Sequence, residues 1–246
     1  MGTSKAYSGI KGNPNWTKLS SSVTRACNTG KISPSSLNRV TSNFVALLGG
    51  SKHGGRGRSK IGGKAGTRTA HRLGKLLIDI KSNGFQSAFS NIGFEFSEET
   101  KANEAINFLL EYCAGVAVTI DETAAKAAER ELLEEIGGNA DTFQELGEDF
   151  QEKIDEYGVE ELLIKYYTYY IYEHLSIDFD EQLIKKKGRK ATSNFYKQLK
   201  NFLFERLKNI ARKRDLSKID WAGKDGENVV SGIFEDTLNA FENYEG

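Results

Sequence analysis

Apolar residues recur every three or four positions through most of this 246-residue chain, which contains only two prolines. This spacing places apolar side chains on one face of a helix, whereas a half-buried strand would alternate apolar and polar residues. Because proline removes a backbone donor and breaks helices, its scarcity favours long, uninterrupted ones. The 14 Phe and 10 Tyr residues can fill a core. We therefore predict a mainly α fold with a multi-helix globular body.

Glycines and capping residues divide the periodic part into separate helices. Gly49-Gly50 and Gly137-Gly138 are predicted stops, and Asp121 is a predicted helix cap. Tyrosines in the helical stretch 162–175 are expected to pack with their hydroxyls reaching the surface. The β-branched run 116–120 is a candidate strand. Helices are predicted over 16–27, 33–48, 69–80, 85–91, 97–112, 121–137, 141–158, 162–175, 192–214 and 227–244.

Two segments lack the helical period. Residues 1–14 are small, polar and basic, so we expect a flexible N-terminal arm followed by one helical domain over 15–246. Residues 49–66 contain eight glycines and five Lys or Arg, which can bury little apolar area and lose much backbone entropy on ordering. The prediction here is a mobile Gly/Arg/Lys-rich loop over 49–68.

Charge is unevenly divided along the chain. The first 78 residues contain 14 Lys and Arg but no Asp or Glu, so subtraction from the totals of 34 leaves 20 basic and 34 acidic residues after them. Either the two parts neutralise each other in the fold, or the basic part binds an anionic partner. The acidic stretch 121–161 and the basic stretch 185–214 present the same two alternatives.

An anionic partner would find two basic surfaces, the loop 52–72 and a predicted basic helix over 185–214. Such segments bind phosphate backbones without reading base sequence, and the corresponding function would be a helical nucleic-acid-binding module. The alternative is that the loop is simply solvated and that the basic helix pairs with the acidic helices of the same chain. The candidate anion-binding residues of the loop are Arg56, Arg58, Lys60, Lys64, Arg68 and Arg72.

Catalytic motifs are not recognisable in the sequence. Gly63-Lys64 lacks both the upstream glycine and the hydroxyl residue of a phosphate-binding loop. The three histidines and two cysteines have neither metal-ligand nor nucleophile spacing, so we predict a protein that is not an enzyme and has no metal or cofactor. The lack of a signal peptide and of a spanning apolar stretch predicts a soluble, cytoplasmic protein with no membrane partner.

The N-terminus offers a different chemistry. Gly2 is small enough for Met1 to be removed, and the exposed glycine amine would have a pKa of about 7.7–8.0. A residue without a side chain also fits a narrow catalytic cleft. Myristoylation is disfavoured, because its motif requires Ser or Thr where this chain has Ala6. Gly2 is thus the candidate modification site.

The first residues also resemble those of a known family. Met1-Gly2-Thr3-Ser4, followed by Tyr7-Ser8-Gly9, is similar to the start of the QatB family, whose members are components of the bacterial Qat anti-phage defence system. The chain length and the lack of catalytic motifs also fit this family. In that family the sequence more often continues Tyr-Gly-Gly-Pro, whereas here Ile10 follows Gly9.

The resemblance implies a non-catalytic component that acts beside an ATPase, a TatD-like nuclease and QatC, an enzyme similar to QueC. Enzymes of the QueC type use ATP to activate a carboxylate on a 7-deazaguanine, which an amine then attacks. A protein N-terminus could replace ammonia in that step, so we expect QatC to hold the arm and to process or modify Gly2. The expected partner-binding residues are Met1, Gly2, Thr3, Ser4, Tyr7 and Gly9.

Overall fold

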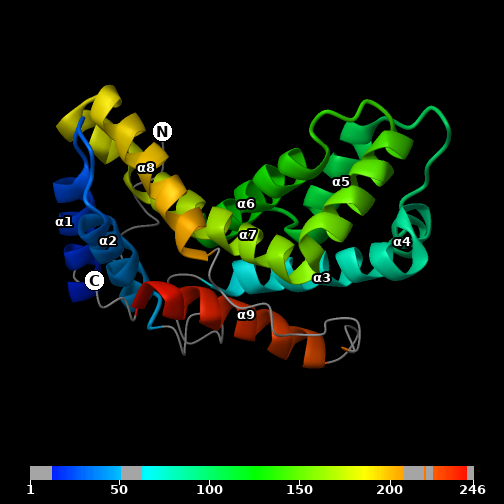
Figure 1. Ribbon diagram of the computed structural model, residues 1–246, viewed down its shortest axis with the longest axis horizontal. Coiled ribbons are helices and arrows are strands. Elements are labelled where there is room, and N and C mark those ends of the chain that lie inside the picture. The colour runs from blue at the N-terminus through cyan, green and yellow to red at the C-terminus, as the bar shows by residue number, and fades with distance from the viewer. Residues whose placement is uncertain (1–12, 51–62, 208–218, 220–223, 243–246) are drawn as a thin grey trace.

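The computed structural model describes residues 13–50, 63–207, 219 and 224–242 of the chain (Figure 1). Within these residues the chain forms nine α-helices and no strand, which confirms the predicted mainly α, multi-helix body. The helices are α1 (Pro14–Ala26), α2 (Pro34–Leu47), α3 (Lys64–Asn83), α4 (Phe85–Asn91), α5 (Ala102–Cys113), α6 (Ile120–Gly137), α7 (Phe143–Lys187), α8 (Arg189–Leu207) and α9 (Lys224–Glu242).

The long helix α7 runs through the middle of the molecule, with α6 packed along it (Figure 1). Helix α3 lies against α6 and α7, and α9 covers α3 while also touching α2 and α7. At one end of the molecule α1 and α2 form a pair beside α8, whereas α4 and α5 form the opposite end (Figure 1). None of the described helices combines the length and apolarity needed to cross a bilayer.

Reciprocal capping boxes begin the two helices that pack most extensively. The Thr119 hydroxyl accepts a hydrogen bond from the backbone of Glu122, whose carboxylate accepts from the backbone of Thr119, and Thr142 pairs with Glu145 in the same way. Each box satisfies backbone donors that a helix start leaves open. The prediction that Asp121 caps its own helix is therefore wrong, because Thr119 already does so.

The start of α3 and the run 116–120 also differ from the sequence predictions. Helix α3 begins at Lys64 rather than 69, so the end of the predicted loop 49–68 is helical. The run 116–120 is not a strand: α6 starts at Ile120, and Val116 and Val118 are 76% and 85% exposed in the connection before it. Isolated from a sheet, a β-branched run has no neighbouring strand to supply hydrogen bonds.

Two glycines interrupt the helices in this part of the chain. The sequence predicts a break at Gly158, but it predicts a continuous helix through Gly188. Gly158, a predicted helix stop, is non-helical with φ 74° and ψ 160°, and it divides α7 into two helical segments. Gly188 has φ 80° and ψ 160° and ends α7, so the predicted single basic helix over 185–214 is wrong. That stretch contains the end of α7 and all of α8, and its residues 208–214 lie outside the described chain.

The core is rich in aromatic rings, as the composition predicts. Tyr166, Tyr167 and Tyr170 are fully buried, which contradicts the expectation that their hydroxyls reach the surface. Buried phenols are tolerated where their hydroxyls find internal partners, and the hydroxyl of Tyr170 binds a carboxylate on α6. These rings fix α7 against α3, α6 and α9.

Candidate functional site

The predicted N-terminal site precedes the described residues. Its modification site and its partner-binding residues lie outside them, and their roles stay predictions; they are Met1, Gly2, Thr3, Ser4, Tyr7 and Gly9.

The structure does describe the stem from which that arm departs. The side chain of Asn13 accepts a hydrogen bond from the backbone N–H of Asn15 at 2.9 Å and so caps α1. The side-chain amide of Asn15 donates to the carbonyl oxygen of Ala46 on α2 at 3.0 Å. The ring of Trp16 stacks on that of Phe179 on α7 at a centroid distance of 5.0 Å. These contacts fix the point at which the arm joins the helical body.

The predicted anion-binding set is only partly described. Arg56, Arg58 and Lys60 lie outside the described residues, whereas Lys64, Arg68 and Arg72 are described. Their four-residue spacing places these three on one face of α3. Lys64 is exposed and has no ion pair within the described chain.

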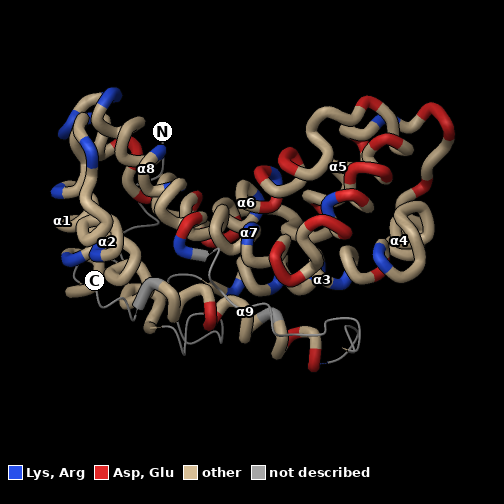
Figure 2. Tube along the Cα trace, viewed as in Figure 1, with Lys and Arg blue, Asp and Glu red and all other residues tan. Residues whose placement is uncertain are grey.

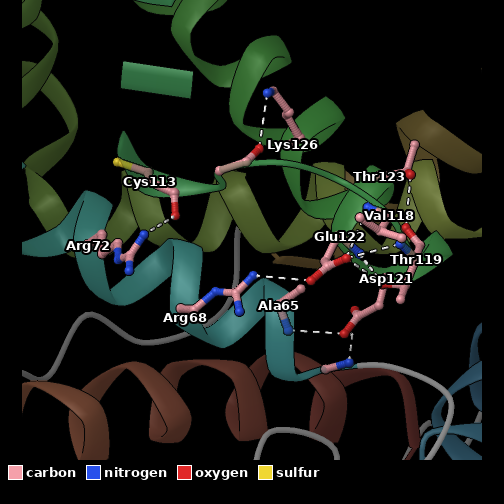
Figure 3. A network of polar contacts seen from close by, with 12 residues as sticks. Ala65, Arg68, Arg72, Cys113, Val118, Thr119, Asp121, Glu122, Thr123 and Lys126 are labelled. Carbon is pink, nitrogen blue, oxygen red and sulfur yellow. Dashed lines mark hydrogen bonds and ion pairs between the residues drawn. The ribbon is translucent and has the colours of Figure 1, made fainter. Parts of the chain in front are cut away.

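The two arginines of this face bind other parts of the fold (Figure 3). A guanidinium nitrogen of Arg68 lies 3.6 Å from a carboxylate oxygen of Glu122, and Nη1 of Arg72 donates to the carbonyl oxygen of Cys113 at 3.4 Å. The same Nη1 donates to the carbonyl oxygen of Tyr112 at 2.8 Å. Both therefore help to join α3 to α5 and α6. An anion arriving at this face would have to compete with partners that these arginines already have.

One carboxylate fixes the start of α3 (Figure 3). The side chain of Asp121 accepts hydrogen bonds from the backbone N–H groups of Gly63 and Ala65 at 3.1 and 3.0 Å. It also accepts one from the hydroxyl of Tyr170. That hydroxyl also accepts from Gly63 N–H at 2.9 Å. A negative charge is favoured at a helix N-terminus, where backbone donors lack partners. Asp121 thus anchors the segment at which the glycine-rich loop ends.

This anchor was missed in the sequence. Asp121 was expected to cap its own helix, but the pattern of Thr119 followed three residues later by Glu122 is a complete capping box. The box leaves the carboxylate of Asp121 available for another element, and that is the signal that could have found it. Burial and the charge of Asp121 both raise the pKa of Tyr170, so this phenol remains a hydrogen-bond donor.

A buried carboxyl, that of Glu129 on α6, lies in the interior. It is fully buried beside the Cys113 thiol and the Ala114 backbone, and neither of its oxygens makes a hydrogen bond of ordinary geometry. Burial raises the pKa of Glu129 to about 8. Burial also raises the pKa of Cys113, which keeps its thiol protonated and poorly nucleophilic.

A buried polar pair is formed by His174 and Asp178 on α7. His174 Nδ1 lies 3.2 Å from Asp178 Oδ2, and the histidine is buried. Burial acts to lower the pKa of His174, but the hydrogen bond and charge of Asp178 outweigh it and raise that pKa. Nowhere in the described chain do three or more His, Cys, Asp or Glu side chains gather as a metal would require.

Opposite charges are separated in space as well as in sequence (Figure 2). Basic residues gather where α1 and α2 meet the end of α7 and the start of α8, and acidic residues gather around α5, α6 and the start of α7. Ion pairs between basic and acidic side chains occur between these two ends. Lys200 Nζ lies 2.7 Å from Glu131 Oε2, and Lys165 Nζ lies 2.5 Å from Glu135 Oε1. Neutralisation within the fold is therefore real but partial.

Comparison with known proteins identifies the family of this chain. The profile of one protein family, the Qat anti-phage system associated protein QatB, matches residues 54–241, which is more than half of the chain. Neither the curated proteins nor the solved structures give a significant match. The match excludes the N-terminal arm, so it is independent of the resemblance in the first residues. The chain therefore belongs to the QatB family and is a component of an anti-phage defence system.

Proposed function

We propose that this chain is the protein partner and N-terminal substrate of QatC, the QueC-like enzyme of the Qat system. The observation that carries the proposal is the family match over 54–241, which is supported separately by the resemblance of the first residues. The helical body provides the docking surface, the arm that precedes Asn13 provides the reacting group, and catalysis belongs to QatC. The system's ATPase and TatD-like nuclease are further candidate partners.

The reacting group in this proposal is the α-amine of Gly2 after Met1 is removed. With a pKa of about 7.7–8.0, an appreciable fraction of such an amine is unprotonated at neutral pH. It attacks the ATP-activated carboxyl group of a 7-deazaguanine held by QatC. An amide bond forms, the phosphate-bearing group leaves with the electrons of the broken C–O bond, and the amine loses a proton. The alternative outcome is cleavage of the arm by the same partner.

The geometry of α1 supports a role for the arm as a ligand of another protein. The described body begins at Asn13, which is tied to Asn15, and Asn15 is tied to α2. A fully extended stretch of the preceding twelve residues could span about 40 Å. That reach is sufficient to enter a deep cleft in a partner that docks on the body.

Intact-mass measurement after co-expression with QatC tests the proposal. The wild-type chain should gain the mass of a deazaguanine adduct, or lose arm residues, only with active QatC and not with a catalytically inactive QatC. Gly2→Leu should retain Met1 and prevent the change. Gly2→Ala, which still permits removal of Met1 but adds a methyl group, should reduce it.

Two readouts separate the parts of this proposal. An unchanged mass, together with defence that survives Gly2→Leu, would sink the role of Gly2. Co-purification with QatC reports docking independently of the chemistry. If the chain and QatC do not associate in either direction of a pull-down, the partner role is wrong as well.

A further inference from the structure

A groove at the basic end of the molecule has the composition of an anion site. It lies between α1 and the end of α7 and has a volume of about 560 Å³. Three of its eight lining residues are the cations Arg25, Lys186 and Lys187, and none is a carboxylate. Figure 2 shows the same end of the molecule as a gathering of Lys and Arg.

Helix α1 contributes a row of hydroxyl groups to this groove. The opposite face of the helix buries Leu19 and Val23 in the core, so helical spacing turns the polar face outward. None of the four hydroxyls makes a side-chain hydrogen bond within the described chain, so all can donate to a ligand. These residues are Thr17, Ser20, Ser21 and Thr24.

Helix dipoles favour the three cations of the groove but provide no counter-ion for them. Arg25 lies in the last turn of α1, and Lys186 and Lys187 lie in the last turn of α7, where cations are favoured. Lys185 pairs with Glu181, but Arg25, Lys186 and Lys187 have no ion pair among the described residues. The cations of this groove have no carboxylate beside them, so they repel one another, and a bound anion would relieve that repulsion.

The cations continue beyond the groove at the start of α8. Arg189 and Lys190 are exposed, and the first turn of α8 contains no acidic residue. A helix N-terminus disfavours cations, so the local helix gains nothing from these two side chains. A row of positive charge that extends past a single cavity suits a chain of phosphates better than one isolated anion.

We propose that this groove, formed by α1 and the end of α7, binds the phosphate backbone of a single nucleic-acid strand. Phosphate oxygens accept hydrogen bonds from lysine, arginine and hydroxyl groups, and such contacts carry affinity without reading bases. The residues that line the groove differ from those proposed for the arm, and this proposal does not depend on modification of Gly2. It also differs from the loop 52–72, because its cations come from α1 and α7.

Fluorescence anisotropy with a labelled 20-nucleotide mixed-sequence DNA strand, at several salt concentrations, tests the groove in the full-length chain without QatC. The triple variant Arg25→Gln, Lys186→Gln, Lys187→Gln should bind about tenfold more weakly or worse, with a shallower dependence on salt, because phosphate contacts release counterions. The matched control makes the same change in charge at exposed positions elsewhere: Lys75→Gln, Lys81→Gln, Lys101→Gln. The control should stay within about twofold of the wild type.

A second variant keeps the cations and tests the hydroxyl face. Ser21→Glu introduces a carboxylate at an exposed position in the groove, and it should weaken binding, whereas Ser90→Glu on α4 should not. Circular dichroism confirms that each variant retains its helices.

Competitors identify the ligand class. Displacement of the strand by unlabelled DNA but not by ATP at the same phosphate concentration supports a polynucleotide, whereas equal displacement by ATP assigns the phosphate site to a free nucleotide. The proposal is overturned if the wild type does not bind the strand or if both triple variants lose affinity equally. Equally tight binding of polyglutamate would also overturn it in favour of an acidic protein.

Discussion

Asp121 joins its own helix, α6, to two others through one side chain. Its carboxylate accepts two backbone hydrogen bonds at the start of α3 and one from Tyr170 on α7, while Asp121 itself belongs to α6. We expect Asp121→Asn to lower the free energy of unfolding by about 2 kcal/mol, because the amide nitrogen would face a donor and leave it unsatisfied. Urea unfolding measures the change. Asp155→Asn, on α7 away from this contact, is the control and should have little effect.

The buried carboxyl of Glu129 makes stability depend on pH. Its pKa is about 8 in the folded chain, against an ordinary value of 4.5. Between these values the unfolded chain has released a proton that the folded chain retains, so stability is full below 4.5 and declines as pH rises through 8. The loss is on the order of a few kcal/mol.

Glu129→Gln removes this titration while keeping the shape of the side chain. Urea unfolding at pH 5 and pH 8 should show a smaller decline for this variant than for the wild type. Glu134→Gln, at an exposed position on the same helix, should keep the wild-type decline. An identical pH dependence for all three chains would show that Glu129 is ionised alike in both states.

Residue-level roles were predictable only where the partner is close in sequence. The capping box of Thr119 and Glu122 is readable because a helix brings residues three apart together. The role of Asp121 at Gly63 was not, because 58 positions separate them and only the packing of α3 on α6 brings them together. The pKa of Glu129 likewise follows from burial that the sequence does not reveal.

Helix α7 changes direction at Gly158. Its φ of 74° and ψ of 160° lie in a region that side chains rarely occupy, although no atom would contact an added Cβ within 4 Å. We expect Gly158→Ala to lower the free energy of unfolding by about 1–3 kcal/mol through backbone strain alone. Gly30→Ala is the matched control, since its Cβ would make only an ordinary contact and its φ is not positive. Equal losses in thermal or urea unfolding would contradict a strained backbone at Gly158.

Helices are predicted best where the apolar periodicity and the helix-terminating glycines agree. The helix over 85–91 has the predicted bounds, and glycines end α2 and interrupt α7 as expected. Errors arise where tertiary contacts replace local sequence signals. The carboxylate of Asp121 accepts a hydrogen bond from the backbone N–H of Ala65, so α3 can start within the glycine-rich segment. The run 116–120 shows the reverse, because β-branched residues without a neighbouring strand do not form one.

At the scale of the whole molecule, the separation of charge divides the surface into two ends of opposite sign (Figure 2). The sequence predicts the imbalance but leaves open whether the charges pair or bind a partner. The structure shows that Lys200 and Lys165 pair with acidic residues of α6, while the cations of the groove have no such pairs in the described chain. Neutralisation within the fold therefore accounts for part of the surface, and binding of an anionic partner remains a prediction for the cations of the groove.

The division into an arm and a helical body predicts that the two can be separated. Helix α1 has its own cap at Asn13, and the described core is built from residues that follow it. We expect a chain that begins at Asn13 to keep its helical circular dichroism and a Tm within about 2 °C of the full chain, because no described core contact is removed.

The same truncation should abolish the mass change that we propose QatC produces. As a control, a chain that begins at Ser33 lacks α1, whose Leu19 and Val23 are fully buried, and it should unfold at a clearly lower temperature. If removing only residues 1–12 lowers the Tm as much, the arm is part of the core rather than a free substrate. That result would require QatC to unfold the body before it could reach Gly2, and the proposed route of modification would fail.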